Sequence, residues 1–537
     1  MGPCNLGPEM SEQHPPRELS DAEAAALCEK LEALIEDRSR IAALTPEVRR
    51  RLLTAAGRFS RPVRDEAKTL TKAFRKRRRE AIAAADEAVL DRTGIRTSRR
   101  APVYPTPSPS LGGPRPFSHL PSPSPSPFPS PSPSSSSSSS SSPSPSSDPP
   151  RLRDPRKCYV CKSAFTELHA FYDQLCPPCA AFNWEKRHQT ADLRGRTALI
   201  TGARVKIGYQ ASIMLLRAGA RVLVTTRFPH DAARRYATEP DFADFGSRLR
   251  IFGLDLRHTP SVELFARHVA ATEPRLDFIL HNACQTVRRP PGFYAHLMEA
   301  ERAPLEALPP AERELVGDFH ALRVDPTLEG ARGLLSAPEL SQAAHTAEDR
   351  LLEGARLALF PAGQLDQDLQ QVDLRDRNSW RLKLGEVPTV ELLEVQLVNA
   401  VAPFVLTNAL RPLMTRDGRR DKHVVNVSAM EGQFYRAHKT DKHPHTNMAK
   451  AALNMLTRTS AADLVQDGIH MNSVDTGWVT DEDPLSISAR KVEEHGFSPP
   501  LDIVDGAARI CDPIFAGVNT GEHPFGQFLK DYKPVPW

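Results

Sequence analysis

Short runs of consecutive apolar residues alternate with longer segments of helical period over residues 191–537. The segments at 197–201, 221–226 and 423–428 have the length of strands, and each carries consecutive apolar residues in its middle. Continuous apolar character is typical of parallel strands that are covered on both faces. The alternation therefore predicts an α/β fold with a doubly wound parallel sheet. A charged, largely helical stretch at about 288–390 interrupts the pattern, and we interpret it as an insertion.

Residues 18–97 form a separate segment with helical period. Ser20 and Glu23 make a capping box before an apolar series, and Thr45-Pro46 is a second helix start. A third helix is predicted at about 64–92. It carries the basic run FRKRRRE, which we interpret as a solvated face because no aromatic residues are interleaved, with an acidic partner or nucleic acid as the alternative. We expect a small bundle or a pair of long helices that has a protein partner.

Proline and serine dominate residues 99–155, including an unbroken serine run from Ser134 to Ser142. Such a stretch buries too little apolar area to offset its conformational entropy. We predict a disordered linker between the helical segment and the rest of the chain.

Charge and cysteine usage limit the classes of protein. The net charge of +4 over 537 residues is too weak to indicate a nucleic-acid partner. No uninterrupted apolar run approaches 18 residues, and the first residues lack the pattern of a signal peptide, so we expect a cytoplasmic protein without a membrane span. Eight cysteines in such a chain indicate reduced thiols or metal ligands.

Four of these cysteines lie in two CxxC turns within residues 156–190. Cys158 and Cys161 form one turn, and Cys176 and Cys179 form the other. Because each turn directs two thiolates at one ion, the two together complete the tetrahedral shell of a structural Zn²⁺. The spacing resembles a zinc ribbon. Two unrelated thiol pairs, or a redox-active CxxC, are the alternatives.

A glycine-containing turn joins the first strand of the α/β region to its helix. The sequence TGARVKIG occupies 201–208. Glycines at such a turn let backbone N–H groups approach a pyrophosphate at the helix N-terminus. The string resembles the TGxxxGxG fingerprint of short-chain dehydrogenases/reductases (SDR), with Gly202 and Gly208 at the outer glycines and Lys206 at the middle one. The resemblance covers about 190–290 and 392–535 and implies a Rossmann domain.

Arginines stand where an NAD-binding domain has an acid. The second strand ends at Arg227, no Asp or Glu occupies 225–227, and Arg204 lies in the glycine turn. Guanidinium groups match the 2′-phosphate of NADP. We therefore predict NADP(H) as the cofactor. The alternative is that Arg227 only solvates the end of the strand.

Further landmarks follow in the order of the family. By resemblance, Asp255 in the pair Asp255-Leu256 contacts adenine. HNAC (281–284) corresponds to the family's NNAG motif. The sequence MNSVDTGWV (471–479) ends in the loop that contacts nicotinamide in the family. The cofactor-binding positions thus implied are Gly202, Arg204, Lys206, Ile207, Gly208, Arg227, Asp255, Leu256, Asn282, Ala283, Lys450 and Val479.

The catalytic set of the family is incomplete in this chain. By resemblance, Asn399 supports a proton-relay water, Ser428 polarises the carbonyl, and Lys450 holds the nicotinamide ribose. Thr446 stands where the family has its tyrosine, and an aliphatic hydroxyl is a poor acid near neutral pH. The loop 432–445 holds Tyr435 and three histidines. We expect Tyr435, or failing it His445, to serve as the proton donor.

These patterns predict an NADP-dependent oxidoreductase that interconverts a carbonyl and an alcohol of a small-molecule substrate by hydride transfer. The alternative is an inactive SDR-derived protein that senses nucleotides or serves as a scaffold. Family resemblance also implies homo-oligomers that pair through the helices bearing Asn399 and Lys450. In the insertion, Trp380 and Leu384 are candidates for a lid over the site, and a purely structural insertion is the alternative.

Overall fold

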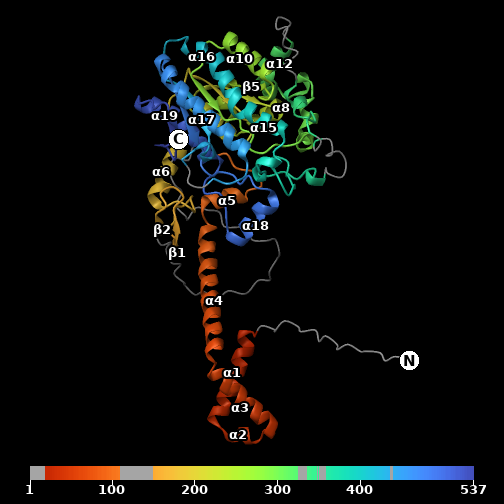
Figure 1. The fold of residues 1–537 in the computed structure, drawn as a ribbon, viewed down its shortest axis with the longest axis vertical. Coiled ribbons are helices and arrows are strands. Elements are labelled where there is room, and N and C mark those ends of the chain that lie inside the picture. The colour runs from red at the N-terminus through yellow and green to blue at the C-terminus, as the bar shows by residue number, and fades with distance from the viewer. Residues whose placement is uncertain (1–18, 109–148, 325–335, 347–348, 350–357, 436–438) are drawn as a thin grey trace, which may run out of the picture. The chain divides into compact units, whose positions relative to one another are not determined.

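The computed structural model describes residues 19–108, 149–324, 336–346, 349, 358–435 and 439–537. The chain divides into two compact units, residues 1–84 and 85–537. Figure 1 shows their elements, and each unit is described by itself below.

An eight-stranded sheet organises the second unit. Its strand order is β10-β9-β8-β7-β6-β3-β4-β5, with every pair parallel except β9 and β10 at one edge. The strands are β3 Thr197–Thr201, β4 Arg221–Thr226, β5 Leu249–Gly253, β6 Phe278–His281, β7 Lys422–Ser428, β8 Ile469–Asp475, β9 Phe528–Lys530 and β10 Lys533–Val535. The order reverses between β3 and β6, which confirms the predicted doubly wound fold.

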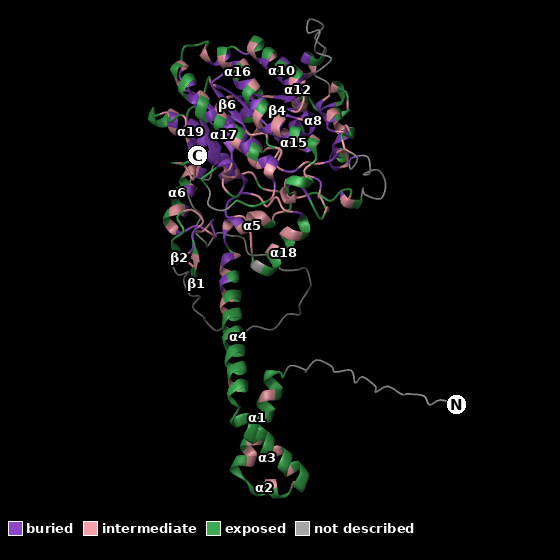
Figure 2. Cartoon of the chain, in the orientation of Figure 1, coloured by how far each residue is buried: buried purple, intermediate pink, exposed green. Residues whose placement is uncertain are grey.

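Helices cover both faces of this sheet, and each face has its own core. Ala198 and Ile200 of β3 belong to one core and Leu199 to the other, as the alternation of side chains along a strand requires. Figure 2 shows the buried residues concentrated between these layers. The first core includes α7 Lys206–Arg217, α8 Pro229–Ala237 and α19 Ile503–Thr520; the second includes α10 Thr259–Thr272, α16 Ala402–Thr415 and α17 Pro444–Leu464. Among the described residues of this unit, the remaining helices of eight or more residues are α6 Pro177–Arg187, α12 Pro310–Val324, α15 Thr389–Gln396 and α18 Leu485–His495.

The first unit is helical. Its elements are α1 Asp21–Glu36, α2 Ser39–Ala42, α3 Pro46–Ser60 and most of α4 Arg64–Leu90. The Ser20–Glu23 capping box and the Thr45 cap with Pro46 stand at the predicted starts. No residue of α1, α2 or α3 is buried. These helices therefore have little core of their own.

Both boundaries of the predicted linker differ from the structure. Leu90 and Ile95, the latter in α5 Gly94–Arg100, are buried with the cysteine segment and so belong to the second unit. Residues 101–108 follow, and Tyr104 donates from its hydroxyl to Asp502 at 2.6 Å. A strand, β1 Arg151–Lys157, begins before residue 155 and pairs with β2 Ala164–Glu167. Residues 109–148, which hold the serine run, lie outside the described part of the chain.

One helical stretch, Thr389–Thr415, is long and apolar enough to cross a membrane by length and composition alone. The sequence reasoning missed it because it required an uninterrupted apolar run. Its inner side chains, including Leu406 and Leu410, lie in the second core. A core helix passes the same test, so this stretch is weak evidence for a membrane span.

Two histidines in the core make stability sensitive to acid. His281 is buried and hydrogen-bonded to Thr407, and burial lowers its pKa to about 3. His423 lies 3.0 Å from His523, and burial, reinforced by the neighbouring histidines and opposed by Asp421, lowers its pKa well below the usual value.

We expect the free energy of unfolding to fall as the pH drops below about 6.5. Histidines of the unfolded chain take up protons there while these two stay neutral. Each costs about 1.4 kcal/mol at pH 5.5. Chemical denaturation at pH 7.0 and 5.5 checks this, and His281→Asn should flatten the profile. An unchanged slope in that variant would count against the assignment.

Candidate functional site

A cavity of about 510 Å³ lies beyond the carboxyl ends of the central strands. Gly202, Thr226, Asp255 and Asn282, which line it, stand at or just after the ends of β3, β4, β5 and β6. In open α/β sheets, ligands bind at this edge where the strand order reverses. The cavity is therefore in the predicted place for a dinucleotide.

Two glycines permit the close packing beneath the cavity. Gly202 has φ +68°, and a Cβ there would lie 2.8 Å from the Cα of Ala283. At Gly208 a Cβ would lie 2.3 Å from the Asn282 side-chain nitrogen, which donates to the carbonyl oxygen of Gly202 at 2.9 Å. The turn is thus locked to the end of β6 by contacts that only glycine allows.

Lys206 occupies the middle-glycine position with φ +56°. The left-handed backbone explains why the family pattern has glycine here, and Lys206 adopts it at some cost. Its Nζ lies 4.0 Å from Asp368, and it lines the cavity together with Ile207. Although burial lowers the pKa of this lysine, Glu482, Asp368 and Asp366 raise it overall. Lys206 therefore carries its charge at the cavity wall.

The two arginines expected at the 2′-phosphate differ in their environment. Arg204 is buried and donates to Asp231 at 2.7 Å, so its guanidinium already has a carboxylate partner, which Arg234 and Arg235 share. Arg227 donates to the hydroxyl of Tyr294, and its guanidinium lies 4.5 Å from the centre of that ring. Among the described residues, it is the cavity's one arginine without a carboxylate in ion-pair distance.

The adenine-side residues also line the cavity. Leu256 and Ala283 contribute apolar surface, and the Ala283 N–H donates to Thr201 at 3.1 Å. Asp255 is buried, and both of its carboxylate oxygens accept from the Arg257 guanidinium. Hydrogen bonds from Arg257 lower the pKa of Asp255 against the effect of burial. Asp255 is therefore an anion that already has a partner.

The insertion builds one wall of the cavity. Residues of η3 Pro291–Leu297 and of the segment 366–378 line it, and Arg289 is ion-paired with Asp373. Trp380 instead stacks on His443, with ring centres 3.8 Å apart, and Leu384 is 81% exposed. The proposed Trp380–Leu384 lid is thus wrong for Leu384, whose side chain faces solvent.

Three of the expected catalytic residues, Asn399, Ser428 and Lys450, are buried and do not line the cavity. The Ser428 hydroxyl donates to Asn454 at 2.6 Å, and Lys450 Nζ donates to the Val427 carbonyl at 2.7 Å. Asn399 lies in the π-helix η9 Leu397–Val401 and accepts from the Gln285 N–H at 2.8 Å. The structure satisfies these groups internally, so none of them projects into the space for a ligand.

The expected proton donor is not at this site. Tyr435 is 82% exposed, because its loop directs it away from the core, so the assignment of Tyr435 is wrong in this structure. His445 is buried, with Nε2 3.3 Å from a carboxylate oxygen of Glu391 in α15. The hydroxyl of Thr446 is buried without a hydrogen-bond partner. His438 lies outside the described residues.

Val479 departs from its expected role. It packs with Leu501 and Ile503 in the core shared with the cysteine segment, and the cavity lining begins one residue later, at Thr480. The extended loop after β8 turns its alternate side chains to opposite sides. Motif spacing does not determine which side chains of a loop face a cavity. The sequence therefore predicted the contact at Val479, whereas Thr480 is the residue that lines the cavity.

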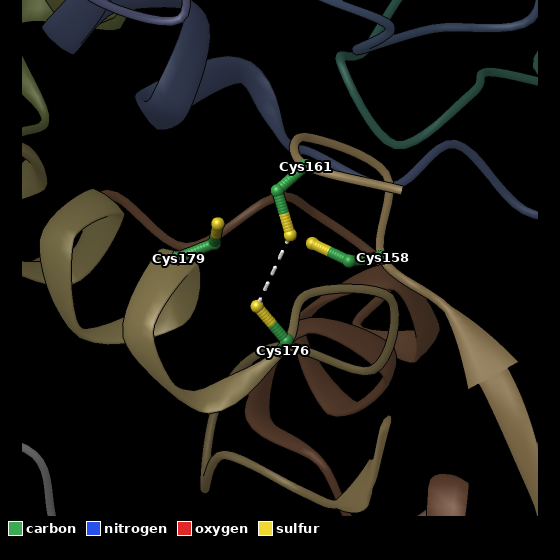
Figure 3. A group of neighbouring side chains, drawn as sticks. All are labelled: Cys158, Cys161, Cys176 and Cys179. Atoms are coloured by element: carbon green, nitrogen blue, oxygen red, sulfur yellow. Dashed lines mark hydrogen bonds between the residues drawn. The ribbon is translucent and has the colours of Figure 1, made fainter. Parts of the chain in front are cut away.

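The four cysteines gather in one place. Their sulfur atoms all lie within 4.8 Å of one another, and those of Cys161 and Cys176 are 3.6 Å apart (Figure 3). A tetrahedral Zn²⁺ with Zn–S bonds of about 2.3 Å holds its sulfurs about 3.8 Å apart. The donor set and the spacing therefore fit a closed zinc site.

The cysteine segment is fastened to the dinucleotide-binding domain. Arg187 of α6 donates to Asp502 at 2.6 Å and to Asp505 at 3.0 Å, at the start of α19. The Tyr159 hydroxyl, within the first CxxC turn, accepts from the Trp478 N–H at 3.0 Å. This turn thus contacts the loop that leads from β8 into the cavity wall.

Sequence reasoning missed Tyr294, Arg257 and Glu394 as parts of the site. Tyr294 and Glu394 are distant in sequence from the arginines that they contact. Tyr294 accepts a hydrogen bond from Arg227, and Glu394 accepts one from Arg257 at 3.0 Å. Arg257, two residues after Asp255, was the only one of the three with a local signal.

Comparison with known proteins agrees with this geometry. The family model described as short chain dehydrogenase matches residues 196–300, and the one described as Enoyl-(Acyl carrier protein) reductase matches 378–495. The gap between the two matches falls within the predicted insertion.

Relatives fall into two groups. An uncharacterised protein, R665 of Acanthamoeba polyphaga mimivirus, is 32% identical over 67% of this chain and 71% of its own length. Human dehydrogenase/reductase SDR family member 13 is 38% identical over 20% of this chain and 26% of its own length. The chain thus spans less than a third of that dehydrogenase.

Solved structures with a similar course of the chain include the NADP complex of Pseudomonas aeruginosa RhlG, 18% identical over 63% of this chain and 95% of that one, with a TM-score of 0.39. Another is carbonyl reductase Sniffer of Drosophila melanogaster, 17% identical over 64% and 99%, with a TM-score of 0.39. Over the strands and turns that build the cavity, the sequence of this chain is thus similar to the short-chain dehydrogenase/reductase family of oxidoreductases.

Proposed function

We propose that this chain binds NADP(H) and responds to it, without the proton chemistry that the family performs with its tyrosine. The observation that carries the proposal is Arg227, a cavity guanidinium held against Tyr294 with no carboxylate partner among the described residues. A cation that faces a cavity and has no carboxylate partner is available to bind an anion there. The 2′-phosphate of NADP supplies that anion at the end of the second strand.

The rest of the cavity suits the remaining parts of the cofactor. Lys206 and the N-terminus of α7 offer a charge and free N–H groups to the pyrophosphate. Leu256 and Ala283 give apolar walls for adenine. When bound, the nicotinamide would supply or accept a hydride. The chain's own residues orient the cofactor and exclude water around it.

Oxidoreduction of a carbonyl or alcohol is the second candidate, and one observation favours it. His445, on the helix that carries Lys450, and Glu391 of α15 form a buried pair 3.3 Å apart. If Ser428 held the substrate oxygen, His445 would be the candidate proton donor on that helix. Asn399 and Lys450 would keep their family roles in water relay and ribose binding.

A binding and turnover experiment separates the two functions. We expect NADPH to bind the full-length chain, detected by tryptophan fluorescence or calorimetry, with no oxidation of NADPH across a panel of aldehydes and ketones. Lys450→Met should leave NADPH affinity within about twofold if the lysine stays bonded to Val427. Turnover that disappears in His445→Gln would replace the proposal by the second candidate. Failure to bind NADPH would reject both.

We further propose that the cysteine cluster holds a structural Zn²⁺. Cys158, Cys161, Cys176 and Cys179 supply four thiolates and leave no open position for a substrate. Segment 151–190 has few buried apolar residues of its own and shares its core with α19. A zinc ion would fix its two turns and so the contact between Tyr159 and Trp478.

A homo-oligomer is proposed on the outer face of α15, α16 and α17. The exposed large apolar side chains there are Leu393, Val401, Phe404, Met448 and Met455. Several exposed large apolar side chains on neighbouring helices are typical of a protein interface. This face coincides with the helices through which the family commonly pairs.

We expect Phe404→Glu to convert the oligomer into monomers in size-exclusion chromatography with light scattering, because a buried unpaired carboxylate at an interface costs several kcal/mol. Leu384→Glu, on the insertion, is the matched control because Leu384 is also highly exposed. A wild-type chain that is monomeric at micromolar concentration would contradict the proposed interface.

A further inference from the structure

Positive charge is concentrated in a short part of the first unit. Residues 38–79 hold fifteen lysines and arginines and three acidic residues, a net charge of +12. Because the whole chain carries +4, the remainder carries −8. The net charge of the whole chain is therefore the sum of two parts of opposite sign. For that reason it does not indicate whether the positive part binds nucleic acid.

Helix α4 arranges much of this charge on one side. With 100° per residue, its basic residues at spacings of four, four, three and four fall within an arc of about 80°. These residues are Arg64, Lys68, Lys72, Arg75 and Arg79, hereafter the basic stripe. Lys76 and Arg78 flank the stripe on its two sides. At 1.5 Å per residue, the stripe is about 22 Å long.

The basic stripe is free to meet a ligand. All five residues are exposed, as Figure 2 shows for this part of α4. Lys68 lies 3.4 Å from Asp65, and the other four have no ion pair with any described residue. An exposed pair of this kind contributes little, so it does not neutralise the stripe.

The apolar side chains near the stripe argue against a membrane surface as its partner. Val63, Leu70 and Phe74 are exposed but appear only about once in two turns, and they leave no broad apolar face between two rows of cations. Helices that lie in a membrane interface need such a face. A rod of positive charge instead matches the phosphates of a duplex.

We propose that the basic stripe of α4 binds the phosphate backbone of duplex DNA, without reading its sequence. A helix exposed around its circumference fits the major groove of B-form DNA, which is about 12 Å wide. Lys76 and Arg78 then reach the phosphates on either side of the five central cations. The major groove of duplex RNA is too narrow to admit a helix, so RNA binds less tightly.

Fluorescence anisotropy of the full-length chain with a labelled 20-bp duplex DNA of mixed sequence tests this. We expect micromolar affinity at 100 mM KCl, and a plot of log affinity against log salt with a slope of about −6, since each phosphate contact contributes about −0.9 and the stripe with Lys76 and Arg78 makes about seven. The variant R64Q/K68Q/K72Q/R75Q/R79Q should bind at least about 100-fold more weakly, with a slope of about −2 from Lys76 and Arg78. Glutamine has a helix propensity near that of lysine and arginine, and circular dichroism checks that α4 is kept.

A matched control removes the same charge elsewhere in the unit. R38Q/R40Q/R49Q/R50Q/R51Q should weaken binding by less than a tenth of the effect of the stripe variant. Equal losses in both variants would overturn the assignment to α4. Equal or tighter binding to duplex RNA of the same sequence, or binding only to vesicles of three parts phosphatidylcholine and one part phosphatidylserine, would overturn duplex DNA as the partner.

Discussion

Replacing Arg227 by Asp is expected to abolish the preference of this protein for NADPH over NADH. The guanidinium has no carboxylate partner among the described residues, so the 2′-phosphate gains a charge-assisted hydrogen bond that NADH cannot make. Such a bond contributes about 1.5–3 kcal/mol, which corresponds to about 10- to 100-fold in affinity. Direct titration with both nucleotides measures the ratio without requiring turnover. Equal affinity of the unmodified chain for NADPH and NADH would refute the prediction.

Tyr294 provides a graded second test of the same site. Tyr294→Phe keeps the ring under the guanidinium and removes the hydroxyl that accepts from Arg227, so only part of the preference should be lost. Tyr294→Ala removes both and should approach the effect of Arg227→Asp. Arg267→Asp, on the exposed side of α10, changes the charge equally and should leave the ratio unchanged.

The features that the sequence predicted correctly are those whose cause is local. Gly202 and Gly208 flank one turn, and the positive φ of Gly202 and the close approach of its carbonyl oxygen to Gly208 arise within one strand–turn–helix unit. The same holds for the capping box at Ser20, where three residues suffice. Continuous apolar strands likewise predict burial on both sheet faces, and from that the doubly wound sheet.

Features that depend on contacts between distant segments could not be predicted. Arg204 and Arg227 look alike in the sequence, but Asp231 on α8 forms an ion pair with Arg204 and none with Arg227. Likewise, Tyr435 has the chemistry of a proton donor, and only the course of its loop shows that it faces solvent. The partner of Arg227 comes from the insertion, whose path across the cavity has no periodic signal.

The expected position of the catalytic residues shows the same limit. The spacing between Ser428 and Lys450 identifies a strand and its following helix. The spacing does not show that the Ser428 hydroxyl is hydrogen-bonded to Asn454 and the Lys450 ammonium to the Val427 carbonyl. These hydrogen bonds determine whether Ser428 and Lys450 face a ligand. They arise from side-chain packing, which a sequence motif does not encode.

Removal of the metal from the cysteine cluster is expected to have the largest effect on stability. The sulfurs are positioned for one Zn²⁺, and residues around them, including Tyr172 and Leu175, share a core with Leu501 and Val504. Binding of structural Zn²⁺ contributes on the order of 10 kcal/mol to folding in small zinc domains. Losing about 10 kcal/mol lowers Tm by about 10 °C in a domain of this size.

We therefore expect purified protein to contain about one zinc per chain and Cys176→Ser to lose it, with a fall in Tm of about 10 °C or more. Because Tyr159 accepts from the Trp478 N–H beside the cavity, the affinity for NADPH should fall as well. Cys28→Ser, an exposed cysteine in α1, is the matched control and should change none of the three. Since Cys176→Ser could fail to fold, the unmodified chain is also titrated with a chelator, and added Zn²⁺ should restore Tm and NADPH affinity together. Metal content well below half an equivalent in protein never exposed to chelator, or an unchanged Tm after chelation, would show that the four thiols hold no structural ion.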